Sequence, residues 1–420
     1  MTTSSDPADD SGSDPGTSSD ETSGPDEPTE GGAVVTGVYR NLFAEAGYDE
    51  AEITAKVDAA YEQLFHGEPS EQAVMVEMGA NESGPLAQIR DIASMDVRSE
   101  GMSYGMMIAV QHDRPEDFDA LWNWSYTYMR HDDPSHPAYR YFSWSVSYDG
   151  VHLDPMPAPD GEEYFAMALY FADARWGSGA GVYDYRAHAD DLLDAMKNRA
   201  DIDNGTSLFN VEHKQVRFTP NVYNFPSNGD HTDPSYHLPA FYELWAEWGP
   251  PADAQFWRDA ATVSRDFFVA TTNDMTALSP DYANFDGTPK GASWDAGTAN
   301  FRFDAWRTSM NWAFDWSWYE ADPRQQELTD LLHAFFTAQG PGYGNHFTLD
   351  GMELSGDHSP GLVAMNAAAT LAATDPGDYA FVEELWDTAV PTGFYRYYDG
   401  MLYMLGLMHV AGEFRAYRPR

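Results

Sequence analysis

The sequence predicts an all-α protein in which about a dozen helices pack in two layers. Twelve segments carry apolar residues at the helical period of about 3.6 residues. Clusters of proline and glycine, such as HGEPS, EWGPPAD and AQGPGYG, separate these segments. Strand signals are few and short, and YRYFSWSVS is an example. Because many of the segments are apolar on several faces, we expect helices buried between other helices rather than a single surface layer.

The expected helices follow one another along the whole chain after its first 50 residues. In order they are 51–65, 101–112, 115–130, 161–176, 186–198, 236–249, 252–270, 304–319, 323–338, 360–374, 377–389 and 400–414. No repeat is visible at the level of the sequence. An α/α barrel of concentric helix rings fits this pattern, and periodicity alone fits a large bundle or a solenoid as well.

Residues 1–33 differ from the rest of the chain. They are rich in Ser, Asp, Pro and Gly, and none of them after Met1 is a large apolar residue. We expect an acidic, disordered tail. The tail has neither the basic and apolar regions of a signal peptide nor a twin arginine, so we expect a cytoplasmic protein unless an export signal is missing from the sequence.

Acidic residues dominate the composition. The 420 residues include 68 Asp and Glu against 23 Lys and Arg, which gives a formal net charge of −45. Nucleic acids and anionic membranes are therefore poor partners, and no apolar run is long enough to span a bilayer. The acidity also suggests a host with molar salt, which screens the repulsion. The oligomeric state is expected to be a monomer or a weak homo-oligomer.

Glu100 is the most informative single residue. It stands at the start of the apolar segment RSEGMSYGMM, beside Met102 and Tyr104. A carboxyl group that enters a core should have a raised pKa, and a carboxylic acid that stays protonated near neutral pH can act as a general acid. A helix-start Glu that only complements the helix dipole is the equally weighted alternative.

Four further motifs carry polar groups at helix starts or in loops. Asp160 precedes a helix in PAPDGEEYFAMALY, and Asp304 heads the Trp-rich NFRFDAWRTSMNWAF; each fits either a catalytic carboxylate or a helix-capping residue. Tyr236 and His237, in DPSYHLP, could orient a water, although a histidine there is more often structural. His358 lies in the loop SGDHSPG.

Several common chemistries lose support. There is no cysteine, so thiolate metal sites, disulfides and Cys nucleophiles are excluded. No HExxH, P-loop, GxGxxG or GxSxG motif is found, and we expect no metal and no cofactor. Helix-start carboxylates together with 13 Trp residues favour a carbohydrate substrate, because aromatic faces stack on sugar rings and paired carboxylates hydrolyse glycosidic bonds.

Four motifs, taken together and in order, resemble glycoside hydrolase family 8. They are RSEGMSYGMM, APDGEEYFAMALYFADARWG, DPSYHLP and FRFDAWR. The resemblance runs from about Val38 to about Arg415 and is greatest to the reducing-end xylose-releasing exo-oligoxylanases. It implies an inverting enzyme, an (α/α)6 barrel and a single catalytic domain over residues 34–420, with xylo-oligosaccharides as substrates.

The resemblance also implies roles for individual residues. Glu100 matches the general acid, Asp304 the general base and Asp160 the carboxylate that holds the distorted sugar. Tyr236 matches the tyrosine beside the attacking water, and Trp144, in YFSWS, matches an aromatic platform. Arg98, in the acid motif, is an expected substrate-binding residue.

His358 falls in the loop that closes the cleft beyond the reducing-end sugar in the exo-enzymes. Those enzymes have His directly before Pro, whereas here Ser359 stands between His358 and Pro360. An endo-acting β-1,4-xylanase or β-glucanase of the same family is therefore the nearest alternative. A non-catalytic sugar-binding barrel and a sugar epimerase with a His pair are alternatives of other classes.

Overall fold

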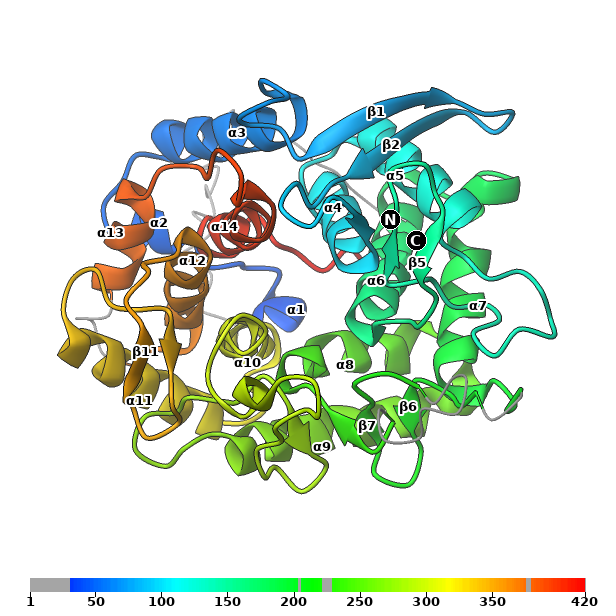
Figure 1. Ribbon diagram of the computed structural model, residues 1–420. Coiled ribbons are helices and arrows are strands. Elements are labelled where there is room, and N and C mark those ends of the chain that lie inside the picture. Colours follow the sequence, from blue (N-terminus) through cyan, green and yellow to red (C-terminus); the bar gives the residue numbers. More distant parts are fainter. Residues whose placement is uncertain (1–30, 203–204, 221–228, 375–378, 420) are drawn as a thin grey trace, which may run out of the picture.

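Twelve helices of nine or more residues form two concentric rings in the part of the chain that the structure describes (Figure 1). The structure is a computed structural model that describes residues 31–202, 205–220, 229–374 and 379–419. The inner ring consists of α4 (Ser99–Gln111), α6 (Pro159–Trp176), α8 (Pro239–Trp248), α10 (Trp306–Tyr319), α12 (Pro360–Ala369) and α14 (Arg396–Val410). The outer ring consists of α3 (Glu50–His66), α5 (Pro115–Tyr128), α7 (Tyr185–Asn198), α9 (Ala254–Thr271), α11 (Arg324–Gln339) and α13 (Tyr379–Asp387). The (α/α)6 barrel is thus confirmed.

Inner helices lie against their inner neighbours around the ring. Backbone contacts join α4 to α6, α8 to α10, α10 to α12, α12 to α14, and α14 back to α4. Side chains bridge α6 and α8: the Tyr242 hydroxyl donates to Glu163 Oε1 at 2.6 Å, and the rings of Tyr164 and Phe241 lie 5.2 Å apart. The ring is therefore closed by buried side chains at this position.

The inner helices are apolar on nearly every face because other helices surround them. In α4, every side chain from Met102 to Val110 is buried. The outer helix α7 is different, since its buried residues recur at helical spacing and its other face is polar. The helical periodicity of the sequence therefore predicted both rings but did not distinguish them.

Short strands connect the helices. The longest pair is an antiparallel hairpin of β1 (Met75–Ala80) and β2 (Pro85–Ile89), which the sequence did not predict. A three-stranded sheet joins β3 (Val97–Arg98), β4 (Ser145–Val146) and β5 (His152–Asp154). The remaining pairs are β6 (Phe209–Asn210) with β7 (Gln215–Val216), β8 (His231–Thr232) with β9 (Ala283–Asn284), and β10 (His346–Phe347) with β11 (Glu353–Ser355).

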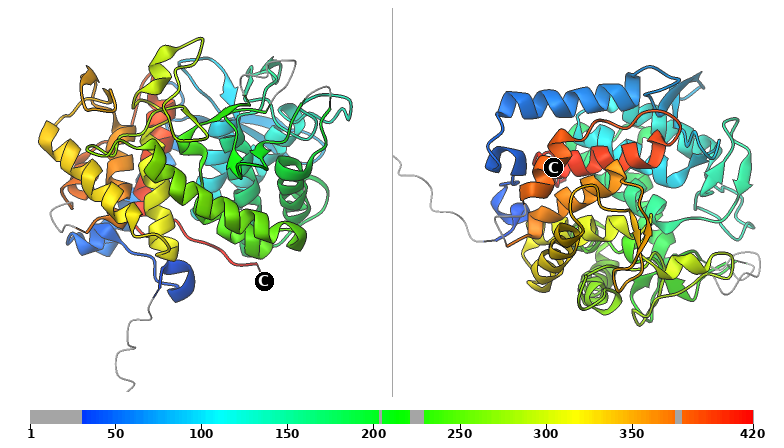
Figure 2. Two further views of the ribbon diagram at one scale, coloured as in Figure 1. Left: turned by 90° about the horizontal axis from the view of Figure 1, so that it is seen from below. Right: turned by 60° about the vertical axis from the view of Figure 1, so that its left-hand side comes forward.

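All six inner helices begin at the same end of the barrel. Three of them, α6, α8 and α12, start with proline at the first helical position, where the missing N–H costs nothing. At the other end, the short helix α1 (Ala33–Thr36) packs on α10, and Gly32 lies against the Trp318 carbonyl. The C-terminus also lies at this end, below the strands and loops (Figure 2).

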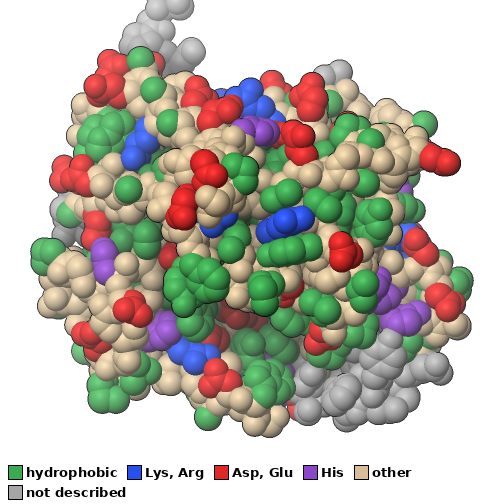
Figure 3. Space-filling model, turned by 45° about the horizontal axis from the view of Figure 1, so that its top comes forward, with side chains coloured by type: hydrophobic (Ala, Val, Ile, Leu, Met, Phe, Trp, Pro, Cys, Tyr) green, Lys and Arg blue, Asp and Glu red, His purple; other side chains and the backbone are tan. Residues whose placement is uncertain are grey.

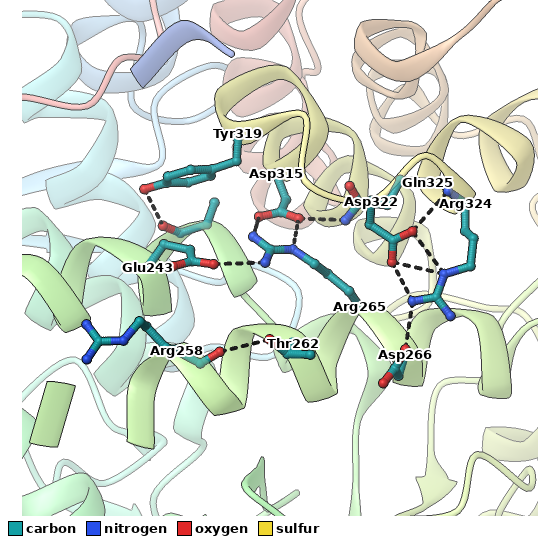
Figure 4. A network of polar contacts seen from close by, with 11 residues as sticks. Glu243, Arg258, Thr262, Arg265, Asp266, Asp315, Tyr319, Asp322, Arg324 and Gln325 are labelled. Carbon is teal, nitrogen blue, oxygen red and sulfur yellow. Dashed lines mark hydrogen bonds and ion pairs between the residues drawn. The ribbon is translucent and has the colours of Figure 1, made fainter. Parts of the chain in front are cut away.

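A network of ion pairs ties the outer ring to the inner ring (Figure 4). Arg265, on α9, donates from Nε and Nη2 to the two carboxylate oxygens of Asp315 on α10, both at 2.8 Å. Its Nη1 donates to Glu243 on α8 at 2.8 Å, and Gln325 on α11 donates to Asp315 at 2.6 Å. Helices α8, α9 and α10 therefore meet at one buried guanidinium, and α11 joins the network through Asp315.

Several expected boundaries differ from the structure: for example, α12 ends at Ala369 rather than at 374, and α8 begins at Pro239 rather than at 236. Ala33, which the sequence assigned to the tail, begins α1, and residues 1–30 lie outside the described residues. Helix α14 begins at Arg396, four residues before the expected start at 400. In the described part of the chain, no helix combines the length and the apolar character needed to cross a membrane.

Candidate active site

A cleft of about 480 Å³ opens at the end of the barrel where the inner helices begin. In Figure 3 the surface has a hollow with acidic side chains at its floor and hydrophobic side chains around it. Residues from the loops and helix starts line the cleft; they are Arg98, Ser99, Glu100, Trp144, Asp154, Met156, Pro157, Ala158, Asp160, Phe218, Thr219, Tyr236, Tyr282, Trp294 and Asp304. Six of the seven predicted site residues are therefore together in one cleft.

Arg307, on the first turn of α10, connects the three predicted carboxylates. Its Nη1 donates to Asp160 Oδ2 at 2.7 Å and to Glu100 Oε2 at 3.1 Å. Its Nη2 donates to Asp304 Oδ1 at 2.8 Å. The Arg307 side chain is 2% exposed. Residues from α4, α6 and α10, far apart in the sequence, thus share one cation.

Glu100 lies in the first turn of α4, as the sequence predicted. Tyr397, on the first turn of α14, donates its hydroxyl to Glu100 Oε1 at 2.9 Å. Burial raises the pKa of Glu100 to about 7, against the opposing effect of Arg307; the charges of Asp160 and Asp304 raise it further. The expected direction of the shift is therefore confirmed.

Two glycines make room for these contacts. A Cβ on Gly101 would lie 2.6 Å from the Tyr397 hydroxyl oxygen, and a Cβ on Gly161 would lie 2.7 Å from Ser99 Oγ. Each glycine directly follows an acid, Glu100 or Asp160. The motifs EG and DG therefore reflect close packing where the starts of α4, α6 and α14 converge.

Asp160 is the most enclosed of the three carboxylates. It is 2% exposed, and its Oδ1 accepts the backbone N–H of Gly161 at 2.9 Å. Burial raises its pKa, opposed mainly by the charge and hydrogen bond of Arg307. It is the second residue of α6, whereas the N-cap is Ala158, so the N-cap interpretation of Asp160 was wrong.

Asp304 precedes α10 and faces the cleft more openly, since its side chain is 28% exposed. Ala305, not Asp304, occupies the N-cap position, so the capping interpretation was wrong here as well. Buried Asp281 accepts the backbone N–H of Ala305 at 3.2 Å and the Nε–H of Arg302 at 3.1 Å. Asp281 therefore contacts the backbone directly after Asp304 and the side chain of Arg302, two residues before it.

Aromatic and cationic side chains form the walls of the cleft. The guanidinium of Arg98 lies over the Trp144 ring, 5.4 Å from its centre, and pairs with Asp91 and Asp96. Tyr236 lies at the end of a 3-10 turn (Pro234–Tyr236), with the Arg307 guanidinium 5.8 Å from its ring centre. The structure thus places Arg98, Trp144 and Tyr236 where a sugar could contact them.

His358 is not among the residues that line the cleft. Its Nδ1 lies 2.9 Å from the Tyr343 carbonyl oxygen, which accepts a hydrogen bond from it, and its Nε2 lies 3.4 Å from Glu384. The hydrogen bond to Glu384 raises the pKa of His358. The structure therefore does not bring this predicted substrate-binding residue together with the other six, and both of its ring nitrogens face groups of its own chain.

His237 has the structural role that its position suggested. It is fully buried, and its two ring nitrogens lie 2.9 Å from Ser264 Oγ and 3.0 Å from Thr232 Oγ1. Burial lowers its pKa to about 3, so the ring is neutral at ordinary pH. Neither His237 nor His358 lines the cleft, which removes support for a histidine-based epimerase.

Several residues of the site are not predicted by the sequence patterns. Arg307 stands three residues after Asp304 inside a quoted motif, and a lone arginine in a Trp-rich helix is the signal that could have indicated it. Tyr397 precedes the helix start that the sequence predicted. Phe218, Tyr282 and Trp294 lie in loops, where no periodicity marks them.

The arrangement can separate an acid from a base. Glu100 holds a proton up to about neutral pH, whereas Asp304 lies on the other arm of the same guanidinium and faces solvent. Pairs of carboxyl groups with different environments are typical of glycoside hydrolases. Among the described residues, no three side chains of ligating type gather as a metal site would require.

Comparison with known proteins agrees with this geometry. Residues 83–412 match the family described as glycosyl hydrolases family 8. The chain is 39% identical over 388 residues to the reducing-end xylose-releasing exo-oligoxylanase Rex8A of Paenibacillus barcinonensis, covering 92% of this chain and 98% of that protein. It is also 39% identical over 392 residues to the reducing-end xylose-releasing exo-oligoxylanase of Halalkalibacterium halodurans, covering 92% and 97%.

Comparison with solved structures also points to this family. A catalytic mutant of a GH8 xylanase from Teredinibacter turnerae, in complex with xylohexaose, superposes with a TM-score of 0.90 at 52% identity, covering 92% of this chain and all of that one. The family match covers most of the chain and includes all three carboxylates. The chain belongs to glycoside hydrolase family 8.

Proposed function

We propose that this protein is an inverting hydrolase of β-1,4-linked xylo-oligosaccharides that releases xylose from the reducing end. The observation that carries the proposal is the 39% identity to reducing-end xylose-releasing exo-oligoxylanases over 92% of the chain. The intact set of Glu100, Asp160 and Asp304 around Arg307 supports hydrolysis over sugar binding alone, because a binding module needs no acid and base.

Each carboxylate has a role that follows from its surroundings. Glu100, protonated up to about pH 7, donates its proton to the oxygen of the leaving xylose. Asp304 accepts a proton from a water that attacks the anomeric carbon from the opposite face. Asp160, buried and bound to Arg307, holds the sugar beside the scissile bond.

The position of Arg307 fits an inverting pair. It donates to the carboxylates of Glu100 and Asp304 through separate nitrogens, which keeps the two groups on different sides of the guanidinium. Inversion needs an acid and a base about 6.5–9.5 Å apart, with room for water between base and sugar. The released glycone should therefore carry a newly formed α-anomeric hydroxyl.

Xylotriose with carbon-13 at the anomeric carbon of its reducing-end xylose tests the proposal, since this label leaves the free hydroxyl intact. We expect free labelled xylose as the first labelled product. NMR of the first-formed xylobiose should show the α-anomer before mutarotation. A β-anomer would contradict inversion, and labelled xylobiose as the main early product would contradict release from the reducing end.

Endo action on longer xylo-oligosaccharides is a second candidate, and two observations favour it. His358 is held by Tyr343 and Glu384 and does not line the cleft. The structure from Teredinibacter turnerae, at 52% identity, is that of a xylanase with bound xylohexaose. Xylohexaose labelled in the same way separates the candidates: exo action gives labelled xylose first, whereas endo action gives labelled xylobiose and xylotriose.

A further inference from the structure

Arg302 bridges two carboxylates, Asp295 and Asp281, that lie next to cleft-lining residues in the sequence. Its Nη2 donates to Asp295 Oδ2 at 2.9 Å, and its Nε donates to Asp281 Oδ2 at 3.1 Å. Asp295 directly follows Trp294, and Asp281 holds the backbone beside Asp304. Arg302 therefore links the segment that carries Trp294 to the segment that carries the predicted base, Asp304.

At the first end of this bridge, Trp294 presents an open aromatic face. The residue is 57% exposed and lines the cleft, with the Phe218 ring 6.1 Å away and inclined at 30°. An indole that is exposed inside a sugar-binding cleft offers a stacking surface for a pyranose ring. A sugar bound there would bear directly on the segment that carries Asp295.

The connection between Trp294 and Arg302 is tight. Asp295 Oδ1 accepts the backbone N–H of Gly297 at 2.8 Å, which caps the 3-10 turn Ala296–Ala299. A Cβ on Gly297 would lie 2.5 Å from Arg302 Nη1. Glycine at this position therefore lets the guanidinium lie directly against the turn that follows Trp294.

At the second end, Asp281 is 2% exposed and has three contacts near the base. Its Oδ1 accepts the Ala305 N–H at 3.2 Å, its Oδ2 accepts from Arg302, and its backbone N–H donates to the Asn300 carbonyl at 3.0 Å. These contacts surround Asp304 on the chain. A displacement of Arg302 would therefore act on the placement of the Asp304 carboxylate.

We propose that Arg302 is a positioning residue that couples the binding of a sugar on Trp294 to the placement of Asp304. The inference rests on the proposed role of Asp304 as base. A base must lie within hydrogen-bond reach of its water, and a misplacement of about 1 Å can cost about 100-fold in rate. The coupling would make turnover depend on substrate length as well as on affinity.

The test compares kcat and KM for xylobiose to xylohexaose in four proteins: wild type, Trp294→Ala, Arg302→Gln and the double variant. In the wild type, we expect kcat to rise when the substrate becomes long enough to reach Trp294. Trp294→Ala should abolish this rise and increase KM for the longer substrates. Arg302→Gln should also abolish this rise, so that its kcat on the longer substrates falls about 5- to 20-fold below that of the wild type. Its KM should stay within about twofold of the wild-type value.

Two controls separate coupling from general damage. Arg302→Lys keeps one of the two ion pairs and should restore part of the length dependence. Arg324→Gln removes another arginine that bridges two aspartates, Asp322 and Asp266, at a place outside the cleft (Figure 4). This control should leave the dependence of kcat on substrate length unchanged.

Each result has one meaning. If Arg302→Gln lowers kcat by the same factor for every substrate length, or if its effect adds to that of Trp294→Ala, the coupling is overturned while the proposed function stands. If the wild type hydrolyses no xylo-oligosaccharide, the proposed function and this inference both fail. A double variant no worse on long substrates than either single variant supports the coupling.

Discussion

Arg307 and Arg265 are both buried arginines that bind more than one carboxylate, but their surroundings differ. Arg307 contacts three carboxylates at the rim of the inner ring, where the cleft admits solvent. Arg265 contacts two carboxylates between the rings, and the amide of Gln325 adds another donor to Asp315. Asp315 is fully buried, whereas the Asp304 side chain is 28% exposed.

The difference shows how one residue type serves stability in one place and chemistry in another. Around Arg265, two contacts from the guanidinium fork and one from the Gln325 amide satisfy the buried carboxylate of Asp315, so this cluster ties helices together. Around Arg307, one positive charge cannot balance three negative charges in a partly desolvated site, so one carboxyl group keeps its proton. Burial is the main cause of the raised pKa of Glu100, and the negative charges of Asp160 and Asp304 add to it.

The largest expected effect comes from comparing two glutamates, one bound to Arg307 and one bound to Arg265. Glu100→Gln should lower kcat on xylo-oligosaccharides by about a thousandfold or more, because the amide cannot donate a proton to the leaving oxygen. The matched change Glu243→Gln, on the Arg265 network, should leave kcat within about twofold. Steady-state kinetics, with circular dichroism to verify folding, compare the two. Near-normal turnover by Glu100→Gln would contradict its assignment as the acid.

The next comparison replaces each arginine, and we expect a loss of activity in one case and a loss of stability in the other. Arg307→Met should lower kcat by about 100-fold or more, since all three carboxylates lose their shared donor. Arg265→Met should instead cost about 3–5 kcal/mol in the free energy of unfolding, because it leaves Asp315 buried and unpaired. Urea unfolding and kinetics on the folded fraction measure both quantities. If Arg265→Met lowers kcat as strongly as Arg307→Met, the proposed division of roles is wrong.

The pH dependence follows from the raised pKa of Glu100. An acid must be protonated to donate, so kcat/KM should fall as pH rises through about 7, by about tenfold per pH unit above it. The same shift affects stability. A carboxyl group with a folded-state pKa above its unfolded value contributes most stability at acidic pH, and that contribution is lost as pH rises from about 4.5 to about 7.

Arg307→Lys sharpens this prediction. Lysine can contact fewer carboxylates at once than the forked guanidinium, so less positive charge faces Glu100. The pKa of Glu100 should then be higher, and the fall of kcat/KM with rising pH should move to higher pH. Arg265→Lys should leave the limb where it is. A limb that does not move in Arg307→Lys would contradict the influence of Arg307 on the acid.

The smallest effect concerns charge outside both clusters. The net charge of −45 should destabilise the folded chain in dilute buffer through repulsion between surface carboxylates. We expect the melting temperature to rise by several degrees between low and molar KCl, because salt screens exposed charges far better than buried pairs. A melting temperature independent of KCl would remove the halophilic interpretation of the composition.

The sequence by itself determined the helical content and most of the candidate site. Twelve segments with helical periodicity correspond to the twelve helices α3 to α14, because burial of an apolar face imposes that period. Glu100, Asp160 and Asp304 were found from carboxylates at the starts of apolar helices and from motifs that resemble a family. These signals are local, so no knowledge of distant contacts was needed.

The structure corrected the sequence where local signals are weak. The β1–β2 hairpin contains Gly79 and Pro85 and has a register shift between Glu77 and Ala80, so its alternation is irregular. The segment RYYDG contains Asp399 and Gly400, whose helix propensity is low, yet helix α14 already begins at Arg396, and Gly400 lies against Leu64. This earlier start brings Tyr397 to Glu100.

Only the tertiary structure decided which polar groups share a site. Arg307 meets carboxylates that are 207 and 147 positions away in the sequence, a relation that no local pattern contains. His358 was predicted as a site residue although Ser359 departs from the family pattern, and in the structure it contacts Tyr343 and Glu384 and does not line the cleft. Residue type and helix position depend on local sequence. The burial of Glu100 and its contact with Arg307, which together set its pKa, depend on three helices meeting in space.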